Sequence, residues 1–320
     1  MKTTTEAAPS RSRVRRERQL RTFKRKVRRS IPYYVLIALP LIYLLIFRYE
    51  PMYGLQIAFR DFKASKGILG SPWVGMKYFK MFLTANSAWQ VISNTFIISL
   101  YSLAAGFPFP ILLALALNGL RSKAVRKTVQ MATYLPYFIS TVVLVALVNQ
   151  FTDMHSGIIN VLIQSITGKT INFMGDLKYF RHVYVWSGVW QGAGYSAIIY
   201  IAALSSINPE LYDAALVDGA NKLQRIWHID LPGILPTVVT LLILNCGQIL
   251  SVGFEKVYLM QNNINLTQSE VITTYTYKLG LQNGNFSMSA AVGMFNSLVN
   301  FAVLLITNSV SKKISGYGVW

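Results

Sequence analysis

The sequence predicts an all-α membrane protein with six transmembrane helices. Hydrophobic residues occupy 53% of the 320 positions and charged residues only 13%, a balance too apolar for an ordinary soluble domain. A helix needs roughly 20 mostly apolar residues to cross the hydrocarbon core of a bilayer. Six stretches of this kind occur, at about 33–49, 91–117, 131–151, 183–205, 234–253 and 287–310. The chain is therefore expected to cross the membrane repeatedly.

Proline is expected to distort the first two of these stretches. Pro40 lies within the first stretch, and Pro108 and Pro110 lie within the second. Membrane helices tolerate proline when neighbouring groups satisfy the backbone carbonyls that it frees. We expect kinks or breaks at these positions, and we expect the third and sixth stretches to be the clearest spans.

The distribution of Lys and Arg predicts the orientation. Residues 1–30 carry twelve Lys or Arg against two Glu and so supply +10 of the +19 net charge. The short connection 121–127 and the tail with Lys312 and Lys313 are also basic. Because basic loops stay in the cytoplasm, we expect a cytoplasmic arm at 1–30, a membrane domain at 31–320 and both termini inside. The connection 54–90 is also basic, although this scheme places it outside. The preference of basic loops for the cytoplasm is weaker for long loops such as this one.

The basic arm also raises the possibility of nucleic-acid binding. A basic segment directly before a first span is what membrane topology alone requires, and it also suits anionic lipid headgroups. We therefore expect membrane lipid, and not nucleic acid, as its partner.

The sequence carries no signature of catalysis. Gly168-Lys169-Thr170 resembles the end of a phosphate-binding loop, but Ile163 stands where that motif needs its first glycine. The histidines are scattered, and Cys246 is the single cysteine, so no metal-ligand cluster is predicted. We expect no catalytic residues, no metal site and no cofactor bound by this chain, so any ATP would be hydrolysed by another subunit.

The polar residues within the predicted spans are almost all uncharged, which argues against a proton or ion relay. Amide and aromatic side chains could bind a neutral, hydroxyl-rich solute, although such residues also join helices to one another. Tyr184 and Trp186 fit better in an interfacial aromatic belt. The candidates for a substrate path are Trp190, Gln191, Tyr195, Tyr200, Asn245 and Gln248.

The polar segment at about 207–232 predicts two short helices around a turn. Asn208 and Asn221 are good N-cap residues, and Pro209 suits a first helical position. Gly219 can adopt the positive φ that ends a helix, and the second helix is expected to stop before Pro232. Leu223, Ile226, Trp227 and Asp230 recur at helical spacing, which suits docking into a partner's groove.

The same segment resembles the EAA loop of binding-protein-dependent ABC importer permeases. That pattern is Glu-Ala-Ala, three residues, Gly, nine residues, Ile, any residue, Leu-Pro. The chain has Asp213 in place of the glutamate and matches the pattern at Ala214, Ala215, Gly219, Ile229, Leu231 and Pro232.

Further segments are similar to the carbohydrate-uptake (LplB-like) subgroup of these permeases. They are Ser71-Pro72-Trp73-Val74-Gly75, Tyr134-Leu135-Pro136, residues 200–204, residues 207–212, Ala290-Ala291-Val292-Gly293 and residues 315–320. The resemblance covers nearly the whole chain.

The resemblance implies a type I ABC importer permease fold and a role in sugar uptake, in particular the uptake of oligosaccharides. It implies a second permease subunit, two ATPase subunits that bind ATP and Mg²⁺, and an extracellular solute-binding protein in a bacterial cell membrane. The seven loop residues from Asp213 to Pro232 that carry the pattern would couple the permease to the ATPase. An ion-coupled secondary transporter and a non-transporting membrane scaffold remain as alternatives.

Overall fold

The computed structural model describes residues 11–120, 122–316 and 318. These residues form helices joined by turns, and their one extended pairing is a bridge between Arg60 and Trp73. The all-α prediction is therefore confirmed. The chain divides into two compact units, Met1–Gln56 and Ile57–Trp320.

The first unit consists mainly of α1 (Arg11–Leu44), which continues into a π-helical turn at Leu45–Tyr49. A 3₁₀ helix at Glu50–Phe59 follows. Pro40 lies inside α1 without ending it, so the irregularity expected there occurs five residues later, in the wide turn. Residues 1–10 of the predicted basic arm lie outside the described residues. The apolar part of α1 is exposed, as expected for a helix in lipid.

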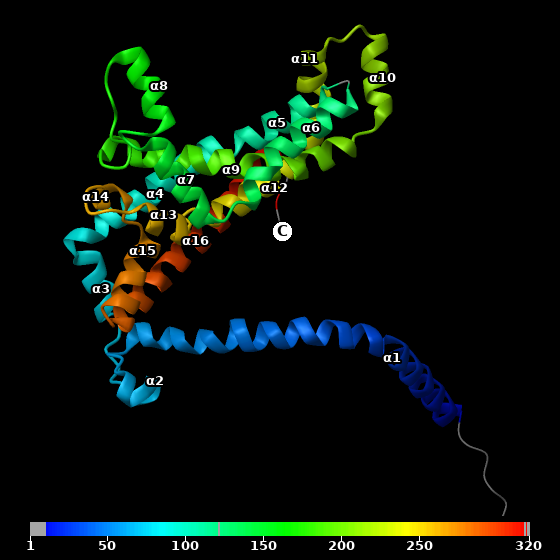
Figure 1. Ribbon diagram of the computed structural model, residues 1–320. Coiled ribbons are helices and arrows are strands. Elements are labelled where there is room, and N and C mark those ends of the chain that lie inside the picture. The colour runs from blue at the N-terminus through cyan, green and yellow to red at the C-terminus, as the bar shows by residue number, and fades with distance from the viewer. Residues whose placement is uncertain (1–10, 121, 317, 319–320) are drawn as a thin grey trace, which may run out of the picture. The chain divides into compact units, whose positions relative to one another are not determined.

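The second unit is a bundle of helices of very different lengths (Figure 1). Its α-helices are α2 (Gly67–Gly70), α3 (Lys77–Thr84), α4 (Asn86–Gly106), α5 (Pro108–Asn118), α6 (Lys123–Tyr134), α7 (Thr141–Thr152), α8 (Ile158–Thr167), α9 (Leu177–Ser205), α10 (Pro209–Val217), α11 (Lys222–Arg225), α12 (Leu231–Cys246), α13 (Phe254–Met260), α14 (Leu266–Ser269), α15 (Ile272–Tyr277) and α16 (Phe286–Ser315). Tight 3₁₀ turns occur at Ala64–Lys66 and Leu135–Phe138, and wide π turns at Ile226–Asp230 and Lys278–Gln282.

Four segments of the described chain are long and apolar enough to cross a membrane, or five if one bent pair counts as a span. The four are Arg29–Phe59, Asn86–Asn118, Lys222–Cys246 and Phe286–Lys313. The fourth predicted span lies in α9, which has 29 residues but includes polar and small residues such as Gln191 and Ser196 that dilute its apolar character. Length and composition of the helices therefore do not reproduce the count of six spans. They do indicate a protein that crosses the membrane several times.

The second predicted span is broken as expected, because α4 ends at Gly106 and α5 begins at Pro108. The third, expected to be one of the clearest spans, is bent in the middle. Lys123–Phe138 and Thr141–Thr152 meet at an angle of 102°. Pro136 lies in the 3₁₀ turn at the bend, and the Ser140 side chain accepts a hydrogen bond from the Val143 N–H and so starts a new helix.

Helix α9 lies at the centre of the second unit and packs against α4, α5, α6 and α12. Its buried Ala197, Tyr200 and Leu204 form one core cluster with residues of α5 and α12. Val185 and Val189 belong to another cluster, with residues of α4 and α13. Helix α9 thus contributes buried residues to two separate core clusters.

The approach of α9 to α6 is close enough to require glycine at residue 194. A Cβ atom at Gly194 would lie 2.0 Å from the Thr133 carbonyl oxygen, far inside van der Waals contact. Gly192, two residues earlier in the same helix, would meet no atom within 4 Å. The two glycines therefore have different roles, and only Gly194 permits the helix crossing.

We predict that Gly194→Ala destabilises the fold by about 1–3 kcal/mol, because the added methyl group must push backbone apart. Gly192→Ala is the matched control, and it should unfold at the same temperature or a higher one, since alanine favours a helix. The measurement is thermal unfolding of the detergent-solubilised protein followed by tryptophan fluorescence. A Gly194→Ala protein as stable as the wild type would contradict the close crossing.

Candidate functional site

The segment 207–232 folds as the two-helix hairpin that its sequence predicts, and Figure 1 shows α10 and α11 side by side. The Asn208 side chain accepts a hydrogen bond from the Glu210 N–H at 3.1 Å, and Pro209 is the first residue of α10. After α10, Gly219 has φ +76°, and the Ala220 N–H bonds back to the Ala215 carbonyl at 2.8 Å. The predicted cap and turn are both confirmed.

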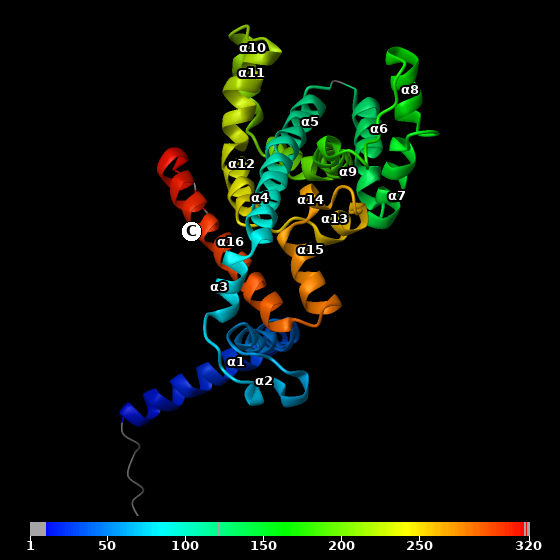
Figure 2. The same ribbon diagram turned by 90° about the vertical axis from the view of Figure 1, so that its left-hand side faces the viewer.

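The second helix of the hairpin does not stop before Pro232, so that expectation was wrong. Asn221 and Gln224 form a reciprocal capping box at the start of α11. The wide turn Ile226–Asp230 then leads directly into α12, and Lys222–Cys246 is one 25-residue segment. Proline clashes with the carbonyl four residues before it in a regular α-helix, and the wider turn before Pro232 relieves that clash. Figure 2 shows α11 and α12 as one continuous column.

A buried hydrogen bond ties the two arms of the hairpin together. The Tyr212 hydroxyl donates to the Asp230 carboxylate at 2.5 Å, and Asp230 is only 5% exposed. Burial and this hydrogen bond raise the pKa of Tyr212 to about 12, so the phenol stays protonated and remains a donor at neutral pH. Asp230 thus faces α10 and does not belong with the exposed apolar residues with which the sequence grouped it.

The hairpin is also anchored where the chain leaves α9 and returns to α12. A Cβ atom at Gly233 would lie 2.5 Å from Cδ1 of Ile207, so the two ends of the segment are in contact. Ile226 and Leu231 pack against the core cluster of α5, α9 and α12. The hairpin is therefore held to the bundle at its base.

The outer surface of the hairpin exposes several large apolar side chains among its charged and polar ones. Its exposed apolar residues are Leu211, Leu216, Val217, Leu223 and Trp227. Val217 is 88% exposed and Trp227 67% exposed. Asp213, Ala214, Gly219 and Pro232 are exposed as well, while Ala215, Ile229 and Leu231 are half-buried. An exposed apolar surface of this kind marks a contact site for another molecule.

The second site is a cavity of about 780 Å³ between α9 and parts of α4, α5, α12 and α13. This volume lies within the usual range of about 300–1,000 Å³ for ligand pockets. Five of the residues predicted for a substrate path line it, namely Gln191, Tyr195, Tyr200, Asn245 and Gln248. Trp190 does not line the cavity and is 53% exposed. Five of the six residues predicted from the sequence therefore line the cavity, and Trp190 does not.

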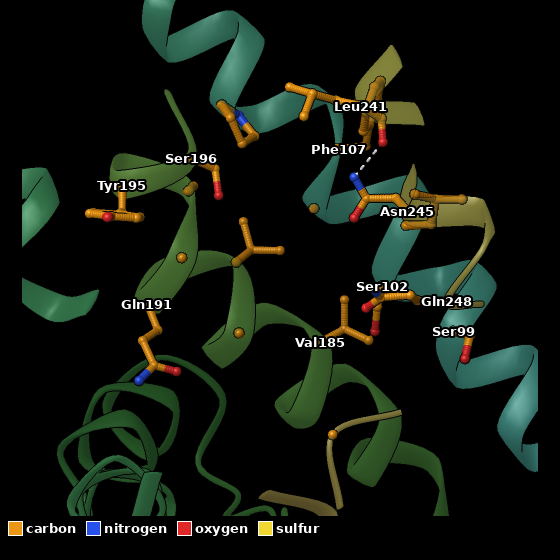
Figure 3. Close-up of a pocket in the computed structure, with 18 of the residues that line it drawn as sticks. Ser99, Ser102, Phe107, Val185, Gln191, Tyr195, Ser196, Leu241, Asn245 and Gln248 are labelled. Atoms are coloured by element: carbon orange, nitrogen blue, oxygen red, sulfur yellow. Dashed lines mark hydrogen bonds between the residues drawn. The ribbon is translucent and has the colours of Figure 1, made fainter. Parts of the chain in front are cut away.

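The polar side chains lie on two sides of this cavity (Figure 3). On one side, Tyr195 stacks on Tyr137 with ring centroids 3.9 Å apart, and the Gln191 amide donates to the Ile139 carbonyl at 2.9 Å. On the opposite side, Asn245 donates to the Leu241 carbonyl at 2.7 Å, with Gln248 nearby. The amides of Gln191 and Asn245 are thereby each held by a backbone carbonyl.

Several lining residues escaped the sequence reasoning. Ser99 and Ser102 of α4 contribute hydroxyl groups, and their three-residue spacing on a helix is the signal that could have revealed them. Tyr184, expected in an interfacial belt, is instead 8% exposed and lines the cavity. Lys256 of α13 also lines it, and no local sequence signal pointed to this residue.

Comparison with known proteins identifies the family. Residues 106–316 match the family described as binding-protein-dependent transport system inner membrane component. The chain belongs to this family. It is also 42% identical to the polygalacturonan/rhamnogalacturonan transport system permease protein YteP of Bacillus subtilis (strain 168), over 90% of this chain and 89% of that protein. It is 38% identical to protein LplB of the same organism, over 90% of both chains.

A solved structure supports the same conclusion. A chain in the crystal structure of a bacterial ABC transporter involved in the import of the acidic polysaccharide alginate is 38% identical, with a TM-score of 0.84. The match covers 92% of the present chain and 99% of the other. The ABC importer permease fold implied by the EAA-loop resemblance, and the LplB-like subgroup, are therefore confirmed.

We predict that Tyr212→Phe loosens the hairpin, because the Asp230 carboxylate would stay buried without its donor at a cost of about 1–3 kcal/mol. Hydrogen–deuterium exchange of the purified permease should become faster across residues 208–231 and stay unchanged in α16. Leu216→Ala, on the exposed face of α10, is the control and should leave exchange as in the wild type. Equal protection in the Tyr212→Phe variant would show that the bond does not hold the hairpin.

Proposed function

We propose that this chain is the membrane permease subunit through which an ATP-driven importer passes oligosaccharides into a bacterial cell. One observation carries the proposal. A single chain joins a cavity lined by aromatic, amide and hydroxyl groups to an exposed apolar hairpin through continuous helices. Its similarity to YteP and to a permease of an alginate importer supports a polysaccharide-derived substrate.

The cavity has the chemistry that a sugar needs. Hydroxyl groups of Ser99, Ser102 and Ser196 and the amides of Asn245 and Gln248 can exchange hydrogen bonds with sugar hydroxyls. The flat ring of Tyr195, which is 42% exposed, can pack against the apolar face of a pyranose. Such a wall binds a hydroxyl-rich solute without a buried acid in the substrate path.

The hairpin is proposed as the coupling joint. Asp213, Ala214, Ala215 and Gly219 would form the close-packed contact with an ATPase subunit, beside the exposed Val217. Ile229, Leu231 and Pro232 would fix the return of the chain to α12. ATP and Mg²⁺ would bind to two partner ATPase subunits, and this chain would itself have no catalytic role.

The geometry explains how movement of the joint would reach the cavity. The segment Lys222–Cys246 has 25 residues, so it extends about 35 Å from the hairpin to Asn245 in the cavity wall. Helix α9 makes the second connection, since Tyr200 lines the cavity nine residues before Pro209 begins α10. Closure of the ATPase subunits would shift both walls together and switch the cavity between outward-facing and inward-facing states.

The rest of the assembly is proposed from the same resemblance. It comprises a second, related permease subunit and an extracellular solute-binding protein that delivers the sugar. In support, one related structure is described as the alginate transporter in complex with an alginate pentasaccharide-bound periplasmic protein. Both termini and the hairpin would lie in the cytoplasm, with the basic arm at 1–30 near anionic lipid.

Uptake of a labelled oligosaccharide into cells distinguishes this function from the two alternatives. We predict that uptake persists when a protonophore dissipates the proton gradient and stops when ATP is depleted. Uptake that follows the ion gradient would identify a secondary transporter, and a strain that lacks the chain but imports normally would identify a scaffold.

We further predict that Val217→Asp separates the permease from its ATPase. Val217 is almost fully exposed, so the change should not disturb the fold, but it places a charge in the proposed apolar contact. Recovery of the ATPase with the tagged permease from solubilised membranes should fall at least about tenfold. Ile166→Asp, at an 83% exposed position in α8, is the control and should retain the ATPase. Equal recovery from both variants would place the joint elsewhere.

A further inference from the structure

The wall of the cavity carries one charged side chain among the described residues. All other lining residues are apolar, or polar and uncharged, whereas Lys256 contributes an ammonium group. An ionisable group in the membrane region of a transporter is costly to bury and usually has a function. The proposed contacts with sugar hydroxyls do not involve this lysine.

The ammonium group of Lys256 is held in a fixed position. It donates to the Tyr184 carbonyl at 2.8 Å and lies 4.7 Å from the centre of the Tyr184 ring. That ring is buried and stacks on Phe180, so it cannot move away. Gly188, one turn further along α9, leaves room for the ammonium group, since a Cβ atom there would lie 3.1 Å from Nζ.

The charge of Lys256 is not neutralised within the described part of the chain. There, the one ion pair joins Lys278 to Glu270 at 2.9 Å, so no described carboxylate pairs with Lys256. An ammonium group has three donor hydrogens, and the Tyr184 carbonyl accepts one. The remaining donors and the net charge are suited to an anionic oxygen atom of a ligand.

We propose that Lys256 forms an anion subsite of the cavity and binds a carboxylate group of an acidic oligosaccharide, one composed of uronate units. This inference rests on the proposed function and names its substrate class.

The position of the subsite agrees with a role at the entrance. Tyr184 and Tyr200 lie 16 residues apart on α9, so the two ends of the cavity wall are about 24 Å apart. Lys256 is at the Tyr184 end, and Tyr200 is at the end that leads to the hairpin. In the proposed orientation, the subsite meets the sugar as it arrives from outside. The rest of the cavity wall is uncharged, so the sugar can move past it without a second strong ionic contact.

The test compares an acidic and a neutral sugar in the intact importer. The complete assembly with its binding protein is reconstituted in liposomes, and ATP-driven uptake is measured for trigalacturonate and for its carboxyl-reduced, uncharged counterpart. Every assembly contains the same binding protein. Its own preference between the sugars therefore cancels when the uptake rate of each variant is divided by the uptake rate of the wild type. Lys256→Gln removes the charge but can still donate to the Tyr184 carbonyl, and Lys256→Arg retains the charge. Lys169→Gln removes an exposed positive charge outside the cavity as a control.

We expect Lys256→Gln to reduce uptake of the acidic sugar at least about tenfold, the usual effect of losing a charge-assisted contact, and to leave uptake of the neutral sugar unchanged. Lys256→Arg and Lys169→Gln should resemble the wild type. An equal fall for both sugars in Lys256→Gln, or no fall for the acidic one, would overturn the subsite while leaving the importer function in place. A wild-type importer that transports neither sugar would overturn the uronate substrate class, whereas the proposed function itself is tested by the dependence of oligosaccharide uptake on ATP.

Discussion

The packing of α9 against its neighbours is the constraint on which the rest of the second unit depends. Helices α4, α5, α6 and α12 all contact it, and its close crossing with α6 allows no side chain at Gly194. In lipid, helices gain little from hydrophobic attraction to one another, so close packing between small residues supplies much of the cohesion. The same helix lines the cavity and leads into α10, which ties the shape of the site to the stability of the bundle.

Irregular turns in this bundle decide whether a helix bends or continues. The bend at Leu135–Phe138 divides one apolar stretch into two helices, and the Ile139 carbonyl that follows holds the Gln191 amide. The wide turn at Ile226–Asp230 does the opposite, since it keeps α11 and α12 continuous past Pro232. It also brings Asp230 to the Tyr212 hydroxyl. Pro136 thus lies in a 3₁₀ turn at which the helix breaks, whereas Pro232 follows a π turn within a continuous helix.

The hairpin could be predicted from sequence because its signals are local. Asn208, Gly219 and Asn221 each act on residues within four positions, so caps and turn follow from chemistry alone. The cavity could be predicted only in part, because its wall is assembled from four separate segments. Helical direction decides that Gln191 lines the cavity and Trp190 does not. Lys256 becomes visible only once α13 is folded against Tyr184.

The exposed apolar surface of the hairpin has a consequence for how much of this protein a cell can safely make. The side chains of Val217 and Trp227 are exposed in the chain alone. Uncovered apolar patches promote aggregation and attract the proteases that remove incomplete assemblies. In the proposed assembly, a chain synthesised in excess of its partners would therefore be short-lived. Matched production of all subunits would then follow from the surface of one hairpin.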